Sequence, residues 1–467
     1  MTLPEEIQPL VLSLLSLKEA ARTSLVSRSW RKLWTRYPNL CFDGSKDGST
    51  DTDSVKIERA KFSETVDSII QQHSEMGLEK FSVRCSLPMD SSDVLNRWIC
   101  FATASKAKTI DVNLCPKGNY VVLIKQVHYF PLEALGAQDR PFIQCLFLTS
   151  VSIKLHSDMP GFTKLRSLHL HCIQIVGDLS GLLLSCSILE DLELIACSGV
   201  SDLNIPRQLD KLRHLLISNM RIQMVEFHVP NLSRFGYKGG TAIPIVLHGC
   251  SKLQKATVTF HQTWLEEDNN KGVRGHVFHG IPSVSAVEVL HVHANMRTNY
   301  PVWSPQVHTL ATRPACMLLN LRHLTYEILV STKSPNSHSG VLQLSQYLAF
   351  APQLEALELH MLYYLSVGRC WRGEGVSYCM HHHDHLKTVY MSGFRCYRAQ
   401  VELMYGILGT GSVLEQVTIE PMVRVPCSPE SMNFSIPRNE ICKWAHHTSQ
   451  RFGKTIIVAE RPQQQCW

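Results

Sequence analysis

The sequence predicts an α/β fold in which a small helical module at the N-terminus precedes a long array of stacked strands. Two patterns support this prediction. Residues 3–40 carry apolar side chains at helical spacing, which is typical of amphipathic helices. From residue 78 onward a second pattern returns many times: an apolar residue, two others, an apolar residue, one other and an apolar residue. Such a pattern is typical of short strands whose alternate side chains enter a shared core.

The N-terminal module is predicted to contain three short helices. Apolar residues from Ile7 to Leu15 form the stripe of the first helix, although Pro9 disfavours a start as early as residue 4. Ser16 followed by Glu19 is a capping-box signature that begins a second helix, which runs to about residue 26. The third helix carries Trp30, Leu33 and Trp34. A segment of about 40 residues is at the lower limit for an autonomous core, so its surplus apolar surface needs a partner.

These residues resemble an F-box, which we place at residues 1–42. The resemblance is carried by the pairs Leu3-Pro4, Leu14-Leu15, Lys18-Glu19, Arg22-Thr23, Trp30-Arg31 and Leu33-Trp34. It implies docking on a Skp-type adaptor that tethers the chain to a cullin. The residues expected to bind the adaptor are Leu3, Pro4, Ile7, Leu10, Leu14, Leu15, Leu25, Val26 and Trp30.

A linker and a capping helix are predicted over residues 43–77. Residues 43–54 contain no apolar side chain, a composition typical of a solvated linker. Residues 57–76 have an approximate helical stripe, and we expect this helix to cover the open end of the array.

The repeated strand pattern predicts a leucine-rich-repeat solenoid over residues 78–421. The clearest copies begin at Leu165, Leu189, Leu212 and Leu354, and weaker copies begin at Leu78, Ala107, Ile143, Leu232, Leu253, Val287, Leu321, Leu386 and Leu414. Spacings in the middle of the array fall in the window of about 20–29 residues that leucine-rich repeats use. We therefore expect a curved solenoid with a parallel sheet on its concave face.

The C-terminal part extends the resemblance. Residues 385–421 are similar to the FBD-like segment of plant F-box proteins, and residues 422–467 are predicted to be a tail or cap. The chain as a whole resembles a plant F-box/leucine-rich-repeat protein. That resemblance implies a substrate-receptor subunit of an SCF-type ubiquitin ligase, whose repeats bind an unknown target protein. Two alternatives remain: a receptor gated by a small molecule in the groove, and an interaction scaffold unconnected to ubiquitin.

The bulk composition argues against several other classes. A balance of 46 Lys and Arg against 40 Asp and Glu gives a formal net charge of only +6, and no run of basic residues indicates nucleic-acid binding. There is no apolar leader after Met1 and no stretch near 18 apolar residues, so we expect neither secretion nor membrane spanning. The 16 cysteines are scattered, as expected for free thiols in the cytoplasm or nucleus.

The sequence contains no recognisable catalytic motif, so we expect a non-catalytic protein without a cofactor. The densest polar cluster combines Cys370 and Cys379 with His381, His382, His383, Asp384 and His385. Its spacing matches no closed zinc site, and a solvent-exposed loop without a metal is the favoured interpretation.

The strand pattern also predicts which side chains face the groove. Because alternate residues point to opposite sides of a strand, the residues between the buried leucines are exposed. The candidates for binding the target are His169, His171, Glu193, His214, Arg234, Lys238, Lys255, His291, His293, His323 and His360.

Overall fold

The computed structural model describes residues 7, 11, 14–15, 17–23, 30, 34–44, 52–74, 77–87, 92–115, 128–136, 142–156, 161–239, 243, 245–264, 287–297, 318–331, 334–337, 340–364, 369–373, 382–422 and 438–459. The chain divides into two compact units. Unit 1 comprises Met1–Ile222 and Phe227–Val229, and unit 2 comprises Gln223–Glu226 and Pro230–Trp467.

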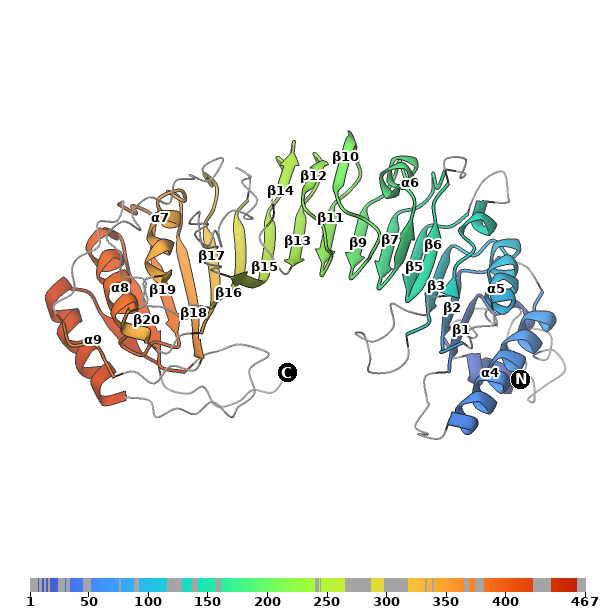
Figure 1. Cartoon of the computed structure of the whole chain (residues 1–467), viewed down its shortest axis with the longest axis horizontal. Coiled ribbons are helices and arrows are strands. Elements are labelled where there is room, and N and C mark those ends of the chain that lie inside the picture. Colours follow the sequence, from blue (N-terminus) through green and yellow to red (C-terminus); the bar gives the residue numbers. More distant parts are fainter. Residues whose placement is uncertain are drawn as a thin grey trace, which may run out of the picture. The chain divides into compact units, whose positions relative to one another are not determined.

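Unit 1 is built on a parallel sheet whose strands follow the order of the chain, with one strand in each repeat (Figure 1). Its strands are β1 (Asn39–Asp43), β2 (Lys80–Arg84), β3 (Thr109–Asn113), β5 (Cys145–Thr149), β7 (Ser167–His171), β9 (Asp191–Ile195) and β11 (His214–Ser218). A smaller sheet contains β4 (His128–Tyr129), β6 (Val151–Lys154) and β8 (Gln174–Val176), and β10 (Leu203–Gln208) follows later in the same unit. The weak repeat copies at Leu78 and Ala107 therefore precede true strands.

Unit 2 continues the same design, again with parallel neighbours in chain order. Its strands are β13 (Arg234–Gly239), β15 (Lys255–Trp264), β16 (Val289–Arg297), β17 (His323–Ser331), β18 (Ala356–Tyr364), β19 (Thr388–Ser392), β20 (Gln416–Glu420) and β21 (Ile456–Val458). The shorter strands are β12 (Val225–His228), at the division between the units, and β14 (Ile245–His248). Every repeat copy predicted from the sequence has a strand, which confirms the predicted α/β repeat fold with parallel sheets.

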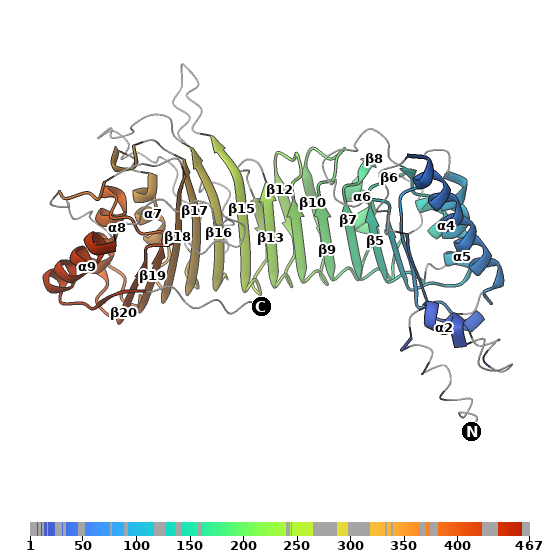
Figure 2. The ribbon, with the colours of Figure 1, turned by 90° about the horizontal axis from the view of Figure 1, so that it is seen from below.

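The core of each unit is formed by alternate side chains of these strands. Leu168 and Leu170 of β7 lie in register with Leu192 and Leu194 of β9, and all four are buried. Figure 2 shows these strands running side by side in the same direction. No single strand could remove its leucines from water, so the stacked repeats share one continuous core.

A residue with positive φ follows several strands of unit 1 at the same point. Ser150, Cys172 and Ala196 have φ of 59°, 53° and 53° and come directly after β5, β7 and β9. The backbone N–H of Cys172 donates to the carbonyl oxygen of Ile195 at 2.7 Å, and that of Ala196 to Ser218 at 2.7 Å. The left-handed residue thus adds one more hydrogen bond to each strand and turns the chain out of the sheet.

Two helices of unit 1 cover the first strands on one side (Figure 1). They are α4 (Thr52–Gln72) and α5 (Ser92–Ala104). Asp67 of α4 accepts hydrogen bonds from the indole Nε1 of Trp98 at 2.8 Å and from Nη2 of Arg97 at 2.6 Å. Trp98 is fully buried, so these bonds satisfy its only polar atom while the ring fills the core.

The structure corrects one predicted boundary at the N-terminal side and adds a strand to the predicted F-box segment. β1 spans residues 39–43 and pairs with β2, so the last residues of the predicted segment 1–42 also belong to the sheet. Leu40 and Phe42 alternate into the core, which is the physical reason that this segment joins the sheet. The helix α4 begins at Thr52, inside the predicted linker 43–54. Thr, Asp and Ser favour the first turn of a helix as well as a linker, so a lack of apolar residues did not distinguish the two.

The array also extends beyond its predicted end at residue 421. The helix α9 (Arg438–Phe452) is followed by β21, which pairs with β20 inside the predicted tail 422–467. The shorter helical elements of both units are α2 (Leu17–Thr23), η1 (Trp34–Arg36), η2 (Leu132–Gly136), α6 (Leu179–Ser185), η4 (Pro335–Ser337), η5 (Gly340–Gln343), α7 (Leu344–Leu348) and α8 (Arg398–Thr410). Within the described part of the chain, no helix has the length and apolar character needed to cross a bilayer.

Candidate functional site

The candidate site is the row of side chains on the solvent side of the parallel strands, which we call the exposed strand face. In unit 1 it contains a group that we call the unit 1 cluster: His169 and His171 of β7, Asp191 and Glu193 of β9, and His214 of β11. All five side chains are half-buried, whereas the leucines between them are buried. The alternation predicted from the repeat pattern therefore holds at these positions.

Strand register brings the members of the unit 1 cluster together. His169 lies directly opposite Glu193, and Asp191 lies opposite both Ser167 on one side and His214 on the other. Neighbouring strands are about 4.8 Å apart, so side chains at matched positions of successive repeats are in contact.

The polar contacts of the cluster are short. The Nε2 atom of His169 lies 2.9 Å from Oδ2 of Asp191, and Nδ1 of His214 lies 2.7 Å from Oδ1 of the same carboxylate. The Nδ1 atom of His169 is 3.4 Å from Oε2 of Glu193, and Nε2 of His171 is 3.2 Å from that same oxygen. The ring of Phe147 on β5 meets His169 edge-on with a centroid separation of 4.6 Å, which fixes the orientation of the imidazole.

The two histidines beside Asp191 change its acidity. Partial burial by itself would raise the pKa of Asp191, but the hydrogen bonds and positive charge of His169 and His214 outweigh burial. The pKa of this carboxyl group is therefore held well below its usual range, and Asp191 remains a carboxylate at any pH near neutrality.

Unit 2 carries a second histidine–carboxylate group, which we call the unit 2 cluster: His291 and His293 of β16 and Glu327 of β17. The Nε2 atom of His291 is 3.2 Å from Oε1 of Glu327, and Nδ1 of His293 is 2.8 Å from Oε2. Hydrogen bonds from both histidines hold the pKa of Glu327 well below its usual range. Each histidine in this cluster thus has a carboxylate oxygen of its own.

The remaining candidates of unit 2 differ in exposure. Arg234, Lys238 and Lys255 are exposed, and Arg234 lies directly opposite Lys255, so this part of the strand face is basic. His323 is also exposed. His360 is half-buried and is the least exposed of the candidate histidines, with 11% of its side chain exposed.

His360 is covered by polar and aromatic neighbours. Its Nδ1 lies 2.8 Å from Oγ of Ser392, and its ring meets that of Tyr390 at 5.7 Å between centroids. Tyr390 in turn donates a short hydrogen bond to Glu420. We attribute a mainly structural role to His360, because a bound protein could reach little of its imidazole.

The strand pattern places Asp191 and Glu327 on the exposed strand face, but neither is among the candidates for binding the target. Each accepts hydrogen bonds from two histidines, so both organise their clusters. A signal was present: an acidic residue at the strand position that a histidine occupies in the neighbouring repeat. It becomes informative only when the register of the two strands is known.

The candidate adaptor-binding residues fall in two groups. Leu3, Pro4, Leu10, Leu25 and Val26 lie outside the described residues. Of the others, Leu14 is 82% exposed and Ile7 is 43% exposed, whereas Leu15 and Trp30 are half-buried. The hydroxyl of Tyr37 donates to the carbonyl oxygen of Leu15, and the carbonyl oxygen of Tyr37 lies 3.0 Å from Nε2 of His73. Through Tyr37, these bonds connect the helical module to His73, the residue that follows α4.

The polar cluster near residue 380 does not form an exposed loop throughout. Cys379 and His381 lie outside the described residues, whereas His383 is buried and its backbone N–H donates to the carbonyl oxygen of Thr410 at 3.3 Å. Asp384 accepts a hydrogen bond from Ser412 at 3.3 Å. The described residues of this cluster thus hold the beginning of the next repeat in place. The described cysteines form no disulfide bonds with one another.

The segment 385–421 forms β19, α8 and β20 in the structure. Its Gln400 is fully buried, where Nε2 donates to the carbonyl oxygen of Gly393 at 2.9 Å and Oε1 accepts from the backbone N–H of Arg395 at 2.9 Å. Glu402 is buried as well and accepts from Nε of Arg398 at 2.8 Å. These residues carry the FBD-like resemblance, which stays a prediction, and they stabilise the turn before α8.

Comparison with known proteins assigns the family. Residues 69–451 match the family described as the At1g61320/AtMIF1 LRR domain, and residues 1–42 match the F-box domain. The repeated strands and the exposed strand face define a leucine-rich-repeat protein. Because the first match covers most of the chain, the chain belongs to this leucine-rich-repeat family and carries an F-box domain in front of it. The predicted resemblance to plant F-box/leucine-rich-repeat proteins is confirmed.

Relatives from Arabidopsis thaliana include an F-box protein and an F-box/LRR-repeat protein. The chain is 27% identical over 293 residues to the F-box protein At3g03040, an alignment that covers 59% of this chain and 57% of that relative. It is 25% identical over 386 residues to the F-box/LRR-repeat protein At3g59210, covering 79% of this chain and 74% of the relative. The matched part thus spans a little over half of the first relative and about three quarters of the second.

The acidity of Asp191 leads to a prediction about stability. Asp191→Asn should lower the melting temperature most at about pH 6 and by a smaller amount at about pH 3. Because the pKa in the folded chain lies below the unfolded value of about 3.9, the carboxylate stabilises the fold above that value. Its contribution is lost as the pH falls toward the folded pKa. Circular dichroism melting curves across this range measure the effect.

The matched control for this measurement is Asp202→Asn. Asp202 is exposed, and its carboxylate accepts a hydrogen bond from Ser201 at 3.2 Å rather than from a histidine. Its substitution should change the melting temperature little at either pH. If Asp191→Asn lowered the melting temperature equally at both pH values, the lowered pKa of Asp191 would be contradicted.

Proposed function

We propose that this chain is the substrate-receptor subunit of an SCF-type ubiquitin ligase. The F-box region would dock on a Skp-type adaptor, and the exposed strand face would hold a target protein for ubiquitination. The observation that carries the proposal is the presence of an F-box match at 1–42 and a leucine-rich-repeat match at 69–451 in one chain. Such a receptor acts by proximity, because it raises the effective concentration of the target near the conjugating enzyme. It needs no catalytic residue of its own, and it would work in the cytoplasm or nucleus.

The exposed apolar side chains near the N-terminus support the adaptor half of the proposal. The backbone N–H of Val11 donates to the carbonyl oxygen of Ile7 at 3.0 Å, and that of Leu14 to Val11 at 3.2 Å. Ile7 and Leu14 are thus linked at a spacing that helical turns bring to one side, and both are exposed to solvent. Exposed apolar side chains that lie together are typical of a protein-binding surface.

The polarity of the strand face supports the target half. Its histidine–carboxylate pairs and exposed basic residues provide hydrogen-bond donors and acceptors on rigid strands rather than an apolar groove. A surface of this kind selects partners through complementary charges and hydrogen bonds, which give specificity and orientation. The partner class that fits it is a protein with a polar, charged epitope.

The small-molecule-gated receptor and the interaction scaffold differ in what they require of the structure. A receptor gated by a small molecule needs its basic residues around a deep pocket, whereas Arg234, Lys238 and Lys255 are all exposed. A scaffold unconnected to ubiquitin would leave the F-box region without an adaptor. Co-expression of the full-length chain with a Skp-type adaptor separates the scaffold from the two receptor classes, because only the scaffold should fail to form a stable complex.

Removal of three strand-face histidines should reduce target capture without affecting adaptor binding. The variant is His169→Ala, His171→Ala and His214→Ala in the full-length chain. Proteins captured by the chain together with adaptor and an inactive cullin should fall in yield by about tenfold, which corresponds to about 1.4 kcal/mol of binding free energy. Quantitative mass spectrometry measures that yield, and the adaptor itself reports whether the complex is intact.

The matched control is His248→Ala. His248 also forms a histidine–carboxylate pair, at 2.9 Å to Oε1 of Glu226, but it lies on β14 outside the main sheet. Its substitution should leave capture unchanged. Equal yields for the triple variant and the unmodified chain would place the target elsewhere on the protein.

A further inference from the structure

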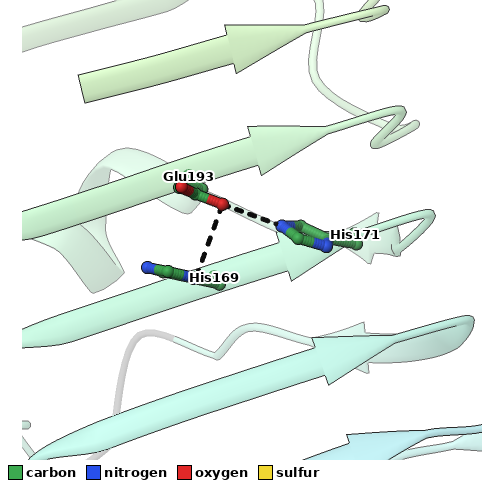
Figure 3. Close-up of side chains that lie close together, drawn as sticks. All are labelled: His169, His171 and Glu193. Atoms are coloured by element: carbon green, nitrogen blue, oxygen red, sulfur yellow. Dashed lines mark hydrogen bonds and ion pairs between the residues drawn. The ribbon is translucent and has the colours of Figure 1, made fainter. Parts of the chain in front are cut away.

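Three potential metal ligands of the unit 1 cluster converge on one point, as Figure 3 shows. They are Nδ1 of His169, Nε2 of His171 and a carboxylate oxygen of Glu193, and each of these atoms lies within 4.8 Å of the other two. The measured separations from Oε2 of Glu193 are 3.4 Å to His169 and 3.2 Å to His171. Metal–ligand bonds of about 2.0–2.2 Å in a tetrahedral site place neighbouring ligand atoms about 3.3–3.6 Å apart. The two separations from Glu193 already have nearly this spacing.

The hydrogen bond from His169 to Asp191 determines which ring nitrogen of His169 can bind a metal ion. Asp191 is a carboxylate, so Nε2 of His169 at 2.9 Å carries the hydrogen and donates it. In the neutral imidazole the lone pair then lies on Nδ1, which faces Oε2 of Glu193. Two electron-rich atoms at 3.4 Å attract a cation between them. A carboxylate that accepts the second N–H of a ligating histidine is the usual outer partner in zinc sites.

The strand geometry makes the two histidines a chelating pair. Residues two apart on a strand point to the same face, and the rings of His169 and His171 are stacked with centroids 6.1 Å apart. Glu193 enters from the neighbouring strand at the position opposite His169. All three donors therefore come from strands of one sheet, whose backbone positions are fixed by the ladder of hydrogen bonds.

We propose that His169, His171 and Glu193 bind a divalent transition-metal ion of the zinc class, with Asp191 as the residue that orients His169. Two imidazoles and one carboxylate suit zinc, and three protein ligands leave a further coordination position for water or for a donor from a bound molecule. This inference does not depend on the proposed function, because it concerns the chain alone.

The unit 2 cluster provides a natural comparison. It has the same pattern of two histidines on one strand and a glutamate on the next, but His291 and His293 bond to different oxygens of Glu327. The unit 2 histidines thus bond to separate oxygens, whereas in unit 1 both His169 and His171 lie near Oε2 of Glu193, to which Nε2 of His171 is hydrogen-bonded. We expect the unit 1 cluster to bind the ion more tightly.

Calorimetric titration of the full-length chain with Zn²⁺ tests the site, and Ni²⁺ serves as a second probe because it prefers imidazole to thiolate. The chain is first treated with a chelator and kept reduced. The unmodified chain should bind one equivalent of either ion. The double variant His171→Ala, Glu193→Gln should lose this binding. The control variant His291→Ala, Glu327→Gln should retain it.

Asp191→Asn provides a test of the orienting role. It leaves all three ligands in place and should weaken Ni²⁺ and Zn²⁺ binding by about tenfold or more, the usual effect of losing an outer carboxylate. Circular dichroism checks that each variant is folded. If the double variant is not, the single variant His171→Ala, at a side chain that is 33% exposed, should still bind at least about tenfold more weakly. The same stoichiometry and affinity in the variants and the unmodified chain would overturn the proposal.

Discussion

Leu14→Arg is expected to abolish co-purification of a Skp-type adaptor with the full-length chain while leaving the repeats folded. Leu14 is 82% exposed in the free chain, so an arginine there remains in water and costs little stability. In a complex, the same arginine would enter an apolar interface without a countercharge. A desolvated charge of this kind costs about 2–5 kcal/mol of binding free energy, enough to remove the complex from a purification.

The matched control is Leu319→Arg. Leu319 is another exposed leucine, at 48%, but it lies in unit 2 and far along the chain from the F-box region. Both variants add one positive charge to the surface, so a general effect of charge would appear in both. Adaptor yield that is the same for Leu14→Arg as for the unmodified chain would refute docking through this residue.

Leu192→Asp is expected to unfold unit 1 or reduce its stability by several kcal/mol. Leu192 is fully buried on β9, in register with Leu168 on one side and Leu215 on the other. The substitution removes apolar packing worth about 2–5 kcal/mol and places a carboxylate in the core without a partner. Urea unfolding followed by circular dichroism measures the loss.

Two variants serve as controls for Leu192→Asp. Glu193→Ala changes the adjacent residue, which faces the exposed side of the strand, and should cost no more than about 1 kcal/mol. Leu184→Asp makes the same leucine-to-aspartate change at a side chain of α6 that is 37% exposed, and surface changes of this kind usually stay within about 0.5 kcal/mol. Similar unfolding midpoints for Leu192→Asp and Leu184→Asp would mean that the assignment of the strand faces is wrong.

The repeat architecture could be predicted because it depends on a local signal. An apolar side chain at every second position of a short strand must be buried, and only stacking of like units can bury it. Even the weak copies at Leu78, Ala107 and Val287 lead into strands, since each keeps two buried residues at alternate positions. The same rule identified the exposed side chains, including His169 and Glu193.

The ends of the array could not be predicted in this way. β21 is preceded by Lys454 where other repeats have an apolar residue, and it joins the sheet through backbone pairing with β20. β1 does have the apolar spacing, at Tyr37, Leu40 and Phe42, but these residues lie within the segment that resembles an F-box. The small exposure of His360 could not be predicted either, because the neighbouring strand contributes Tyr390 and Ser392 to its surroundings. In each case the missing information lies in a segment that is distant in sequence.

The class of the protein, the repeated strands and the face on which each strand residue lies follow from the local sequence pattern. Which residues of the exposed strand face meet depends on the folded arrangement of the strands. His169, His171 and Glu193 are spread over two repeats, and their convergence depends on the register that pairs His169 with Glu193. Register is set by the packing of the leucines on the other face of the sheet, since a slip of one residue would reverse both faces. A cluster of polar side chains on this solenoid is therefore positioned by the apolar core behind it.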